Sequence, residues 1–294
     1  MITCCGRLDI IINSMAQTII LYHKNCDDGF GAAWAAWKKF GNKAAFIAIA
    51  PDDMPPQGLA GKDVYTLDLC FPLEITKRLL KVTKSLTVID HHISSQKAAL
   101  MVPNHVFNGD QTQSGATLAW RYFHSRKPVP KLLRYIEDID LWSIKKPHTF
   151  ELSAALEVYG RDFKTWSKIA KDWEGSKIAK YIETGKTLVA YQKDIIERVV
   201  ADAVKVEFCG IKTYAANFTG KMVSRIGHAL YTKLPPMSII WTTKKDHIKI
   251  SLRSNGKVDV SKLAARFNGG GGHKASAAFR LPFGSKLPWK LIKK

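Results

Sequence analysis

Two aspartates placed directly after apolar runs are the residues best suited to carry chemistry. Asp68 follows VYTL and Asp90 follows LTVI. A carboxylate at the tip of a buried apolar strand costs free energy unless its charge is compensated, and a bound metal ion would compensate it. A helix N-cap or a loop position is the alternative explanation for either aspartate taken alone.

Histidines and a third aspartate occur at similar positions. His23 ends the apolar run TIILYH, Asp28 follows closely, and His91 and His92 come directly after Asp90. Carboxylates and imidazoles are ligands for hard to borderline divalent ions, with Mn²⁺ favoured over Mg²⁺ or Co²⁺. Two such ions about 3.5–4 Å apart can hold a phosphoryl group and activate a water that hydrolyses it. The set therefore predicts a site for two divalent cations.

An alternation of strands and helices is expected to position these side chains. The predicted strands are TIILYH, DVYTLDL and SLTVIDHH, and the predicted helices are FGAAWAAWKKF, PLEITKRLLKV, SGATLAWRYFHS and PKLLRYIEDIDLW. This order predicts a mainly parallel sheet flanked by helices. Ligands of such sheets bind beyond the carboxyl ends of the strands, so three strand ends could converge on one site.

The rest of the chain predicts a second, smaller α/β domain. Residues 151–200 are helical by composition and spacing. The following strands are VKVEFCGIKTYAANF, MSIIWTTKKDHIKISLRS and SAAFRL, and the helices are SRIGHALYTKL and VSKLAARF. The expected fold class is α/β, with a metal-binding domain over 16–185, a helical linker over 186–205, and a substrate-binding domain over 206–294 across a cleft.

Composition narrows the partners and the compartment. Forty-five Lys and Arg against 25 Asp and Glu give a formal net charge of +20, which favours a polyanionic partner. The five cysteines are scattered and lack zinc-ligand spacing, which indicates a reducing compartment. No apolar run reaches the about 18 residues of a membrane span, and the opening residues are unlike a secretory signal. We expect a cytoplasmic protein without membrane contact, with translation starting at Met1 or Met15.

Four motifs in a fixed order carry a resemblance to a known family. These are YHKNCDDGFGAAW, YTLDLCFP, VIDHH and YIEDIDLW, followed by the glycine-histidine segment GGGGHKASAA. From about Thr18 onward the chain resembles the DHH phosphoesterase superfamily, and the last segment resembles the signature of the DHH-associated C-terminal domain. VIDHH alone would be a weak pattern, but the full series is specific.

The resemblance implies a role for each matching position. Asp68 would bridge the two cations, Asp90 would support His91 or bind directly, and His92 would face the scissile phosphate as a donor or acid. A packed structural histidine is the alternative for His92. The implied catalytic residues are Asp68, Asp90 and His92, and the implied metal ligands are His23, Asp28, Asp68, Asp90, His91 and Asp138. At the last position Asp140 is the second choice.

The first motif departs from the commoner family pattern, in which two aspartates alternate just before the glycine. Asp28 matches the second of these aspartates, and Cys26 stands where the first would be. Asp27 could substitute through a shifted turn, Asn25 or Cys26 could complete the ligand set, or one cation could be held more weakly. The sequence leaves these alternatives open.

The glycine run predicts a contact with a substrate phosphate. Glycine lets backbone N–H groups approach an anion closely, and a run that opens into an Ala-rich helix, here KASAA, would present a helix N-terminus to it. Arg253 could clamp a phosphate bidentately. The implied substrate-binding residues are Arg253, Gly270, Gly271, Gly272 and His273.

The resulting functional hypothesis is a phosphodiesterase of short oligonucleotides or (cyclic) dinucleotides, using two divalent cations, most readily Mn²⁺. The chain is similar in this respect to the nano-RNases and cyclic-dinucleotide phosphodiesterases of the family. Single-stranded RNA or DNA is the expected partner, and a homodimer is compatible with it. A polyphosphate or pyrophosphate hydrolase is one alternative. The other is a non-catalytic nucleic-acid-binding protein whose metal site has decayed.

Overall fold

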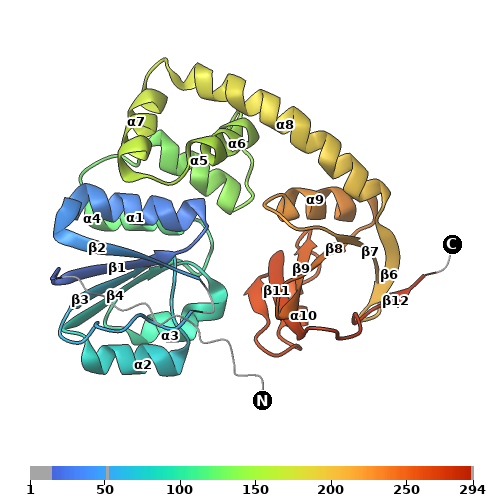
Figure 1. Ribbon diagram of the computed structural model, residues 1–294, viewed down its shortest axis with the longest axis horizontal. Coiled ribbons are helices and arrows are strands. Elements are labelled where there is room, and N and C mark those ends of the chain that lie inside the picture. Colours follow the sequence, from blue (N-terminus) through green and yellow to red (C-terminus); the bar gives the residue numbers. More distant parts are fainter. Residues whose placement is uncertain (1–14, 51–52, 293–294) are drawn as a thin grey trace. The chain divides into compact units, whose positions relative to one another are not determined.

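The computed structural model describes residues 15–50 and 53–292 (Figure 1). The first 14 residues, on which the choice between Met1 and Met15 as the start depends, lie outside this part of the chain. The described chain divides into a first unit that ends at Lys186 and a second that begins at Thr187. That division falls inside one helix, α8 (Ile178–Ala201).

The first unit contains a five-stranded parallel sheet in the order β2-β1-β3-β4-β5. Its strands are β1 (Thr18–His23), β2 (Ala44–Ile49), β3 (Asp63–Leu67), β4 (Ser85–Asp90) and β5 (Asn104–Phe107). The fold class predicted from the alternating pattern is therefore confirmed. The sequence pattern missed β2 and β5, which form the two sheet edges. β5 is short and carries two exposed polar residues, whereas β2, AAFIAI, is apolar throughout and was overlooked although its composition fits a strand.

Helices cover both faces of this sheet (Figure 1). One face carries α1 (Asp27–Phe40) and α4 (Gly115–Phe123), and the other carries α2 (Leu73–Val82) and α3 (Gln96–Met101). Alternate residues of β1 enter separate cores, since Ile20 packs with Trp34 and Trp120 of the first layer while Ile19 packs with the second. Burial on both faces explains why the middle of β1, Ile19 to Leu21, is apolar at every position. Short 3₁₀ turns cover Gly41–Lys43 and Ile93–Ser95.

Three further helices extend the layer of α1 and α4. They are α5 (Lys131–Asp140), α6 (Thr149–Tyr159) and α7 (Phe163–Glu174). Trp166 and Trp173 of α7 are fully buried in the same core, together with Tyr181 from the start of α8. The predicted helical character of residues 151–200 is thereby confirmed.

The second unit contains a mixed sheet in the order β10-β11-β9-β8-β7-β6-β12, in which only β7 and β8 pair in parallel. Alternate residues face separate cores: Ile239 packs with α10 residues and Ile240 packs with α9 residues. The elements are β6 (Val204–Phe208), β7 (Ile211–Asn217), α9 (Val223–Lys233), β8 (Met237–Thr243), β9 (His247–Ser254), α10 (Val260–Ala264), β10 (Gly271–His273), β11 (Ser276–Pro282) and β12 (Lys290–Leu291).

The segment KASAA is a turn and a strand, which corrects the expected Ala-rich helix after the glycine run. Gly271–His273 forms β10, and the chain turns back at once so that Ser276 pairs with His273. Ala277 and Phe279 then enter the core at alternate positions, which is the period of a strand. No helix N-terminus follows the glycines, so that part of the phosphate-cradle argument is wrong.

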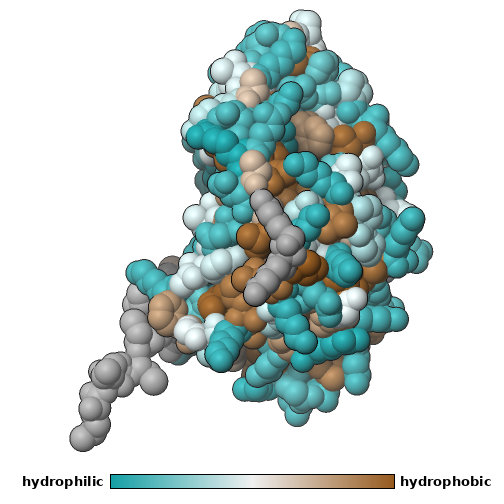
Figure 2. Space-filling view, turned by 90° about the vertical axis from the view of Figure 1, so that its right-hand side faces the viewer, coloured by the Kyte–Doolittle hydropathy of each residue, from teal (hydrophilic) through white to brown (hydrophobic). Residues whose placement is uncertain are grey.

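The second unit carries most of the net positive charge. Residues 187–294 contain 20 Lys and Arg but only 6 Asp and Glu. Hydrophilic residues predominate on the face in Figure 2, with apolar areas scattered between them.

Within residues 15–50 and 53–292, we find no helix with the length and apolar character needed to cross a bilayer.

Candidate metal centre

Three neighbouring strands deliver polar side chains to one edge of the first sheet. His23 ends β1, Asp68 directly follows β3, and Asp90 ends β4. Because β1, β3 and β4 are adjacent and parallel, their carboxyl ends lie side by side. Asp68 has a positive φ of 54°, a conformation that non-glycine residues rarely adopt and that concentrates at functional sites.

Asp68 lies at the centre of the cluster. Its Oδ2 is 3.2 Å from Nδ1 of His23, and its Oδ1 is 3.2 Å from Nε2 of His91. The residue is only 2% exposed, and Oδ1 accepts no well-aligned hydrogen bond in the described part of the chain. Its two oxygens therefore face two different imidazoles, which is the arrangement of a carboxylate that bridges two cations.

One side of Asp68 faces His23 and Cys26. Ligand atoms of these three residues lie within 4.8 Å of one another. Asp27 is directed elsewhere, since its Oδ1 accepts a hydrogen bond from Nε of Arg161 at 3.0 Å and forms an ion pair with Nη2 at 2.7 Å. Of the residues that could complete this group, the structure brings in Cys26.

The other side of Asp68 faces His91, Asp28 and Asp140. Nε2 of His91 is 3.7 Å from Oδ2 of Asp28 and 3.6 Å from Oδ2 of Asp140. Ligands bound about 2.1 Å from an octahedral cation lie ~3 Å apart, so these separations need only a small contraction to fit one ion. Burial and the neighbouring Asp68 raise the pKa of Asp28 well above its usual value.

Asp138 does not join this cluster, although the sequence favoured it over Asp140. Its carboxylate accepts hydrogen bonds from the backbone N–H groups of Lys145 and Lys146 at 3.0 and 3.2 Å, and from the hydroxyl of Thr149 at 2.5 Å. Residues two apart on a helix point about 200° away from each other, so α5 can direct only one of the two aspartates at His91. Asp138 instead holds the segment after α5.

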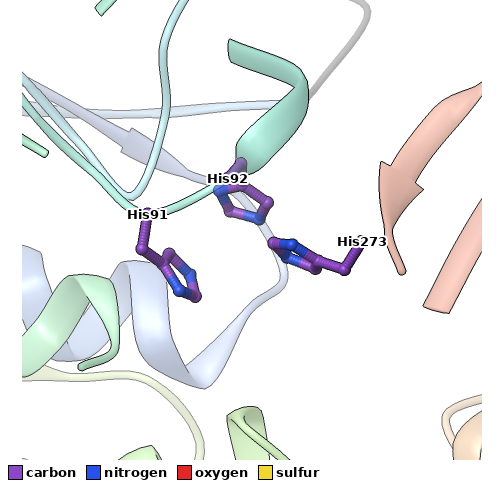
Figure 3. Close-up of side chains that lie close together, drawn as sticks. All are labelled: His91, His92 and His273. Carbon is purple, nitrogen blue, oxygen red and sulfur yellow. The ribbon is translucent and has the colours of Figure 1, made fainter. Parts of the chain in front are cut away.

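His92 lies beside His91 after β4, with ring centroids 4.6 Å apart (Figure 3, which also draws His273 of β10). Nδ1 of His92 is 2.7 Å from Oδ1 of Asp90, whose carboxylate also accepts hydrogen bonds from the N–H groups of His91 and His92 and from the Ser95 hydroxyl. Burial opposes protonation of His92, but Asp90 outweighs it and raises the pKa to about 10. Asp90 therefore orients a protonated imidazole.

The donor set fits divalent cations. Three carboxylates crowd around one imidazole: Asp28 and Asp68 are buried, and Asp140 is more exposed. Crowding of like charges in a desolvated site is costly without a compensating cation. Although burial lowers the pKa of His91, the three carboxylates raise it to about 9, so a proton partly supplies this compensation. A cation bound by the same ring nitrogen would replace that proton.

Backbone N–H groups at the start of α4 are a part of the site that the sequence did not reveal. The N–H groups of Gly115 and Ala116 donate to the two oxygens of Asp28 at 2.6 and 3.0 Å. From the sequence, SGATLAW is a predicted helix that resembles one lining the active-site cleft of the DHH family, and its opening Ser114 is more simply explained as a cap; neither interpretation assigned a role to these N–H groups. The signal available was Gly115, because a Cβ there would lie 2.7 Å from Cβ of Asp68.

We expect Gly115→Ala to weaken the centre. Its Cβ would also lie 2.9 Å from Oδ2 of Asp28, so either α4 or the two aspartates must shift, at a cost of about 1–3 kcal/mol. Thermal unfolding with and without Mn²⁺ should show a lower midpoint and a smaller gain from the metal. Gly175→Ala is the control, since the nearest atoms there are 3.9 Å away. Equal behaviour of the two variants would contradict this role of Gly115.

In the second unit, Arg253 and His273 lie on one row of the sheet. Arg253 pairs with Ser276, and Ser276 pairs with His273, so both side chains leave the same face. Nε of Arg253 donates to the hydroxyl of Ser224 at 3.1 Å, and Nη1 donates to the carbonyl of Leu252 at 2.9 Å. Burial lowers the pKa of Arg253 to about 10, which leaves it charged at neutral pH.

Two of the predicted substrate-binding glycines have a packing explanation. A Cβ on Gly270 would lie 2.0 Å from the carbonyl oxygen of Ala264, and one on Gly272 would lie 2.6 Å from that of Ser276. Gly272 also has a φ of 138°. The space beside both residues is filled by the chain itself, so close packing of β10 already requires glycine there. Gly271 lies between them in β10.

The first unit is an α/β fold with a parallel sheet. Two neighbouring clusters of carboxylate and imidazole side chains lie at the carboxyl ends of its strands, and together they form a candidate binuclear metal centre. Residues 202–288 match the DHHA1 domain family. A curated relative, an uncharacterized protein of Acanthamoeba polyphaga mimivirus, is 29% identical over 291 residues, covering 90% of this chain and 68% of that protein.

Solved structures share the fold at low sequence identity. An exopolyphosphatase-related protein from Bacteroides fragilis matches with a TM-score of 0.57 and 15% identity, over 95% of this chain and 88% of that one. RecJ from Thermus thermophilus, in complex with Mn²⁺, matches with a TM-score of 0.52 and 14% identity, over 90% of this chain and 49% of RecJ. The DHHA1 match is thus confined to the second unit, and the solved structures show that the fold of the chain is shared with these proteins.

Proposed function

We propose that this protein is a metal-dependent phosphodiesterase that hydrolyses short oligonucleotides or dinucleotides with two divalent cations, Mn²⁺ being the first candidate. The observation that carries the proposal is Asp68, whose two buried oxygens face His23 and His91 separately at 3.2 Å. RecJ, which has the same fold, is in complex with Mn²⁺. One cation would be held by His23, Cys26 and Asp68, and the other by Asp28, Asp68, His91 and Asp140.

The side chains around this centre have distinct tasks in the proposed reaction. When bound, the cations would neutralise the phosphoryl oxygens and supply a nucleophilic water at neutral pH. His92 is held through Nδ1 by Asp90, which favours the protonated imidazole, and that imidazolium can give the proton of its other nitrogen to the leaving oxygen. Asp90 acts by orienting His92.

The charge of the second unit supports a polyanionic substrate. It has 20 basic but only 6 acidic residues, and this excess of positive charge attracts phosphates. Salt limits the attraction to distances of about the Debye length. Arg253 is oriented by two hydrogen bonds, and a guanidinium has five donors suited to bidentate binding of a phosphate. Together these features favour a substrate with more than one phosphate or a nucleotide chain.

Turnover of 5′-labelled oligonucleotides of two to about 20 residues would test the proposal, with pApA and inorganic polyphosphate as parallel substrates. We expect Mn²⁺-dependent release of mononucleotides, fastest for the shortest chains and abolished by EDTA. Hydrolysis of polyphosphate alone would favour the pyrophosphatase alternative. Binding of oligonucleotides that neither Mn²⁺ nor EDTA affects, without turnover, would favour a non-catalytic protein.

Arg253→Lys is expected to raise KM for a dinucleotide about 10-fold or more while changing kcat less, because lysine keeps the charge but cannot bind a phosphate bidentately. Steady-state kinetics would measure this. Arg280→Lys is the matched control: Arg280 lies on β11, is exposed, and should be insensitive to the same exchange. A similar KM change in both variants would show that general electrostatics, and not this guanidinium, governs binding.

A further inference from the structure

The first cation position contains a sulfur atom. Cys26 is the N-cap residue of α1, and its ligand atom lies within 4.8 Å of those of His23 and Asp68. Asp68 is nearly fully buried. Cys26 is thus one of three potential ligands from two segments, the β1–α1 turn and the end of β3, and not an isolated thiol.

Neighbouring residues that could take its place are directed away. The carboxylate of Asp27 is paired with Arg161 at 2.7 Å. Asn25 is exposed, has a φ of 58°, and its carbonyl accepts a hydrogen bond from Arg161 at 3.5 Å. Arg161 therefore holds the turn Asn25–Asp27 from outside. Cys26 lies between the two residues that Arg161 contacts, and it faces His23 and Asp68.

We propose that Cys26 is a thiolate ligand of the first cation, making that position a His-Cys-Asp site. This inference rests on the proposed function, because it concerns one of its two cation positions. The thiol loses its proton when it binds the ion. A thiolate favours softer ions than a carboxylate does, so Cys26 would shift this position towards Co²⁺ and Zn²⁺ relative to Mn²⁺.

Absorption spectra of the full-length protein titrated with Co²⁺ would test the inference, with bound cobalt measured separately. We expect a near-ultraviolet band from thiolate-to-cobalt charge transfer in the wild type. Cys26→Ser should lose this band and keep the visible cobalt bands of the remaining ligands. A variant with Cys4, Cys5, Cys70 and Cys209 replaced by serine should keep the band, because Cys26 remains.

A second variant addresses metal preference. Cys26→Asp replaces sulfur by a carboxylate, so it should bind cobalt without the charge-transfer band. Its affinity for Zn²⁺ relative to Mn²⁺ should fall by about 10-fold or more. Circular dichroism would establish that each variant is folded.

The outcomes separate this inference from the proposed function. Cobalt binding without a charge-transfer band in the wild type, or a band that survives in Cys26→Ser, would overturn the role of Cys26 and leave the binuclear centre standing. Absence of any cobalt, zinc or manganese binding would overturn both proposals.

Discussion

Asp68→Asn is expected to lower kcat/KM for a dinucleotide by at least about 1,000-fold, equivalent to about 4 kcal/mol of transition-state stabilisation. Each oxygen of Asp68 faces a different histidine, so the substitution removes a ligand charge from both proposed cations. The amide nitrogen that replaces one oxygen carries hydrogens and cannot coordinate an ion. Steady-state hydrolysis at saturating Mn²⁺ would measure the loss.

Thermal unfolding gives a readout of the same substitution that does not depend on turnover. At Mn²⁺ concentrations 100 times Kd, binding would stabilise the wild type by about 2.7 kcal/mol. For a unit of this size that corresponds to a rise in Tm of roughly 5–10 °C. We expect this rise to disappear in Asp68→Asn, while the metal-free variant stays folded because a crowded buried charge has been removed.

Asp63→Asn is the matched control for Asp68→Asn. Asp63 lies at the opposite end of the same strand, where it pairs with Lys84 at 3.0 Å and Ser85 at 2.7 Å. Its loss should cost about 1 kcal/mol of stability and leave turnover and the Mn²⁺ response unchanged. Full activity of Asp68→Asn, with the Tm response intact, would sink the bridging role.

Asp140→Asn and Asp138→Asn are expected to have opposite effects. Asp140 lies 3.6 Å from His91 and its side chain is 26% exposed, so its loss should cost about 100-fold in kcat/KM with little change in the stability of the metal-free protein. Asp138 is buried and accepts three hydrogen bonds, so its loss should lower the free energy of unfolding by about 2–3 kcal/mol.

The two variants are each other's control, since they change the same group two residues apart on α5. Urea unfolding without metal would measure stability, and hydrolysis well below the unfolding midpoint would measure activity. Asp138→Asn should keep most of its activity under those conditions. A stable but inactive Asp138→Asn, together with an active Asp140→Asn, would reverse the assignment made from the structure.

The sequence alone determined the layout of the first unit and most of the candidate centre. Buried parallel strands are continuous apolar runs, so β1, β3 and β4 were visible in the sequence, and His23, Asp68 and Asp90 were recognised by their places at the strand ends. Strand β5 was missed because it is a short edge strand with exposed polar residues and lacks that signal, whereas β2, AAFIAI, carries the signal and was overlooked.

Only the tertiary structure decided which nearby side chains face the centre. Spacing left Cys26 and Asp27 both open, and it favoured Asp138 over Asp140. In the structure Arg161 holds Asp27, and the N–H groups of Lys145 and Lys146 hold Asp138, so contacts with other segments decide both cases. Contacts with another segment also explain Gly270: position 270 requires glycine because a Cβ there would collide with the carbonyl oxygen of Ala264. A linear pattern records which residues are buried, whereas the direction of a side chain at the end of a helix depends on contacts that form only when distant segments pack.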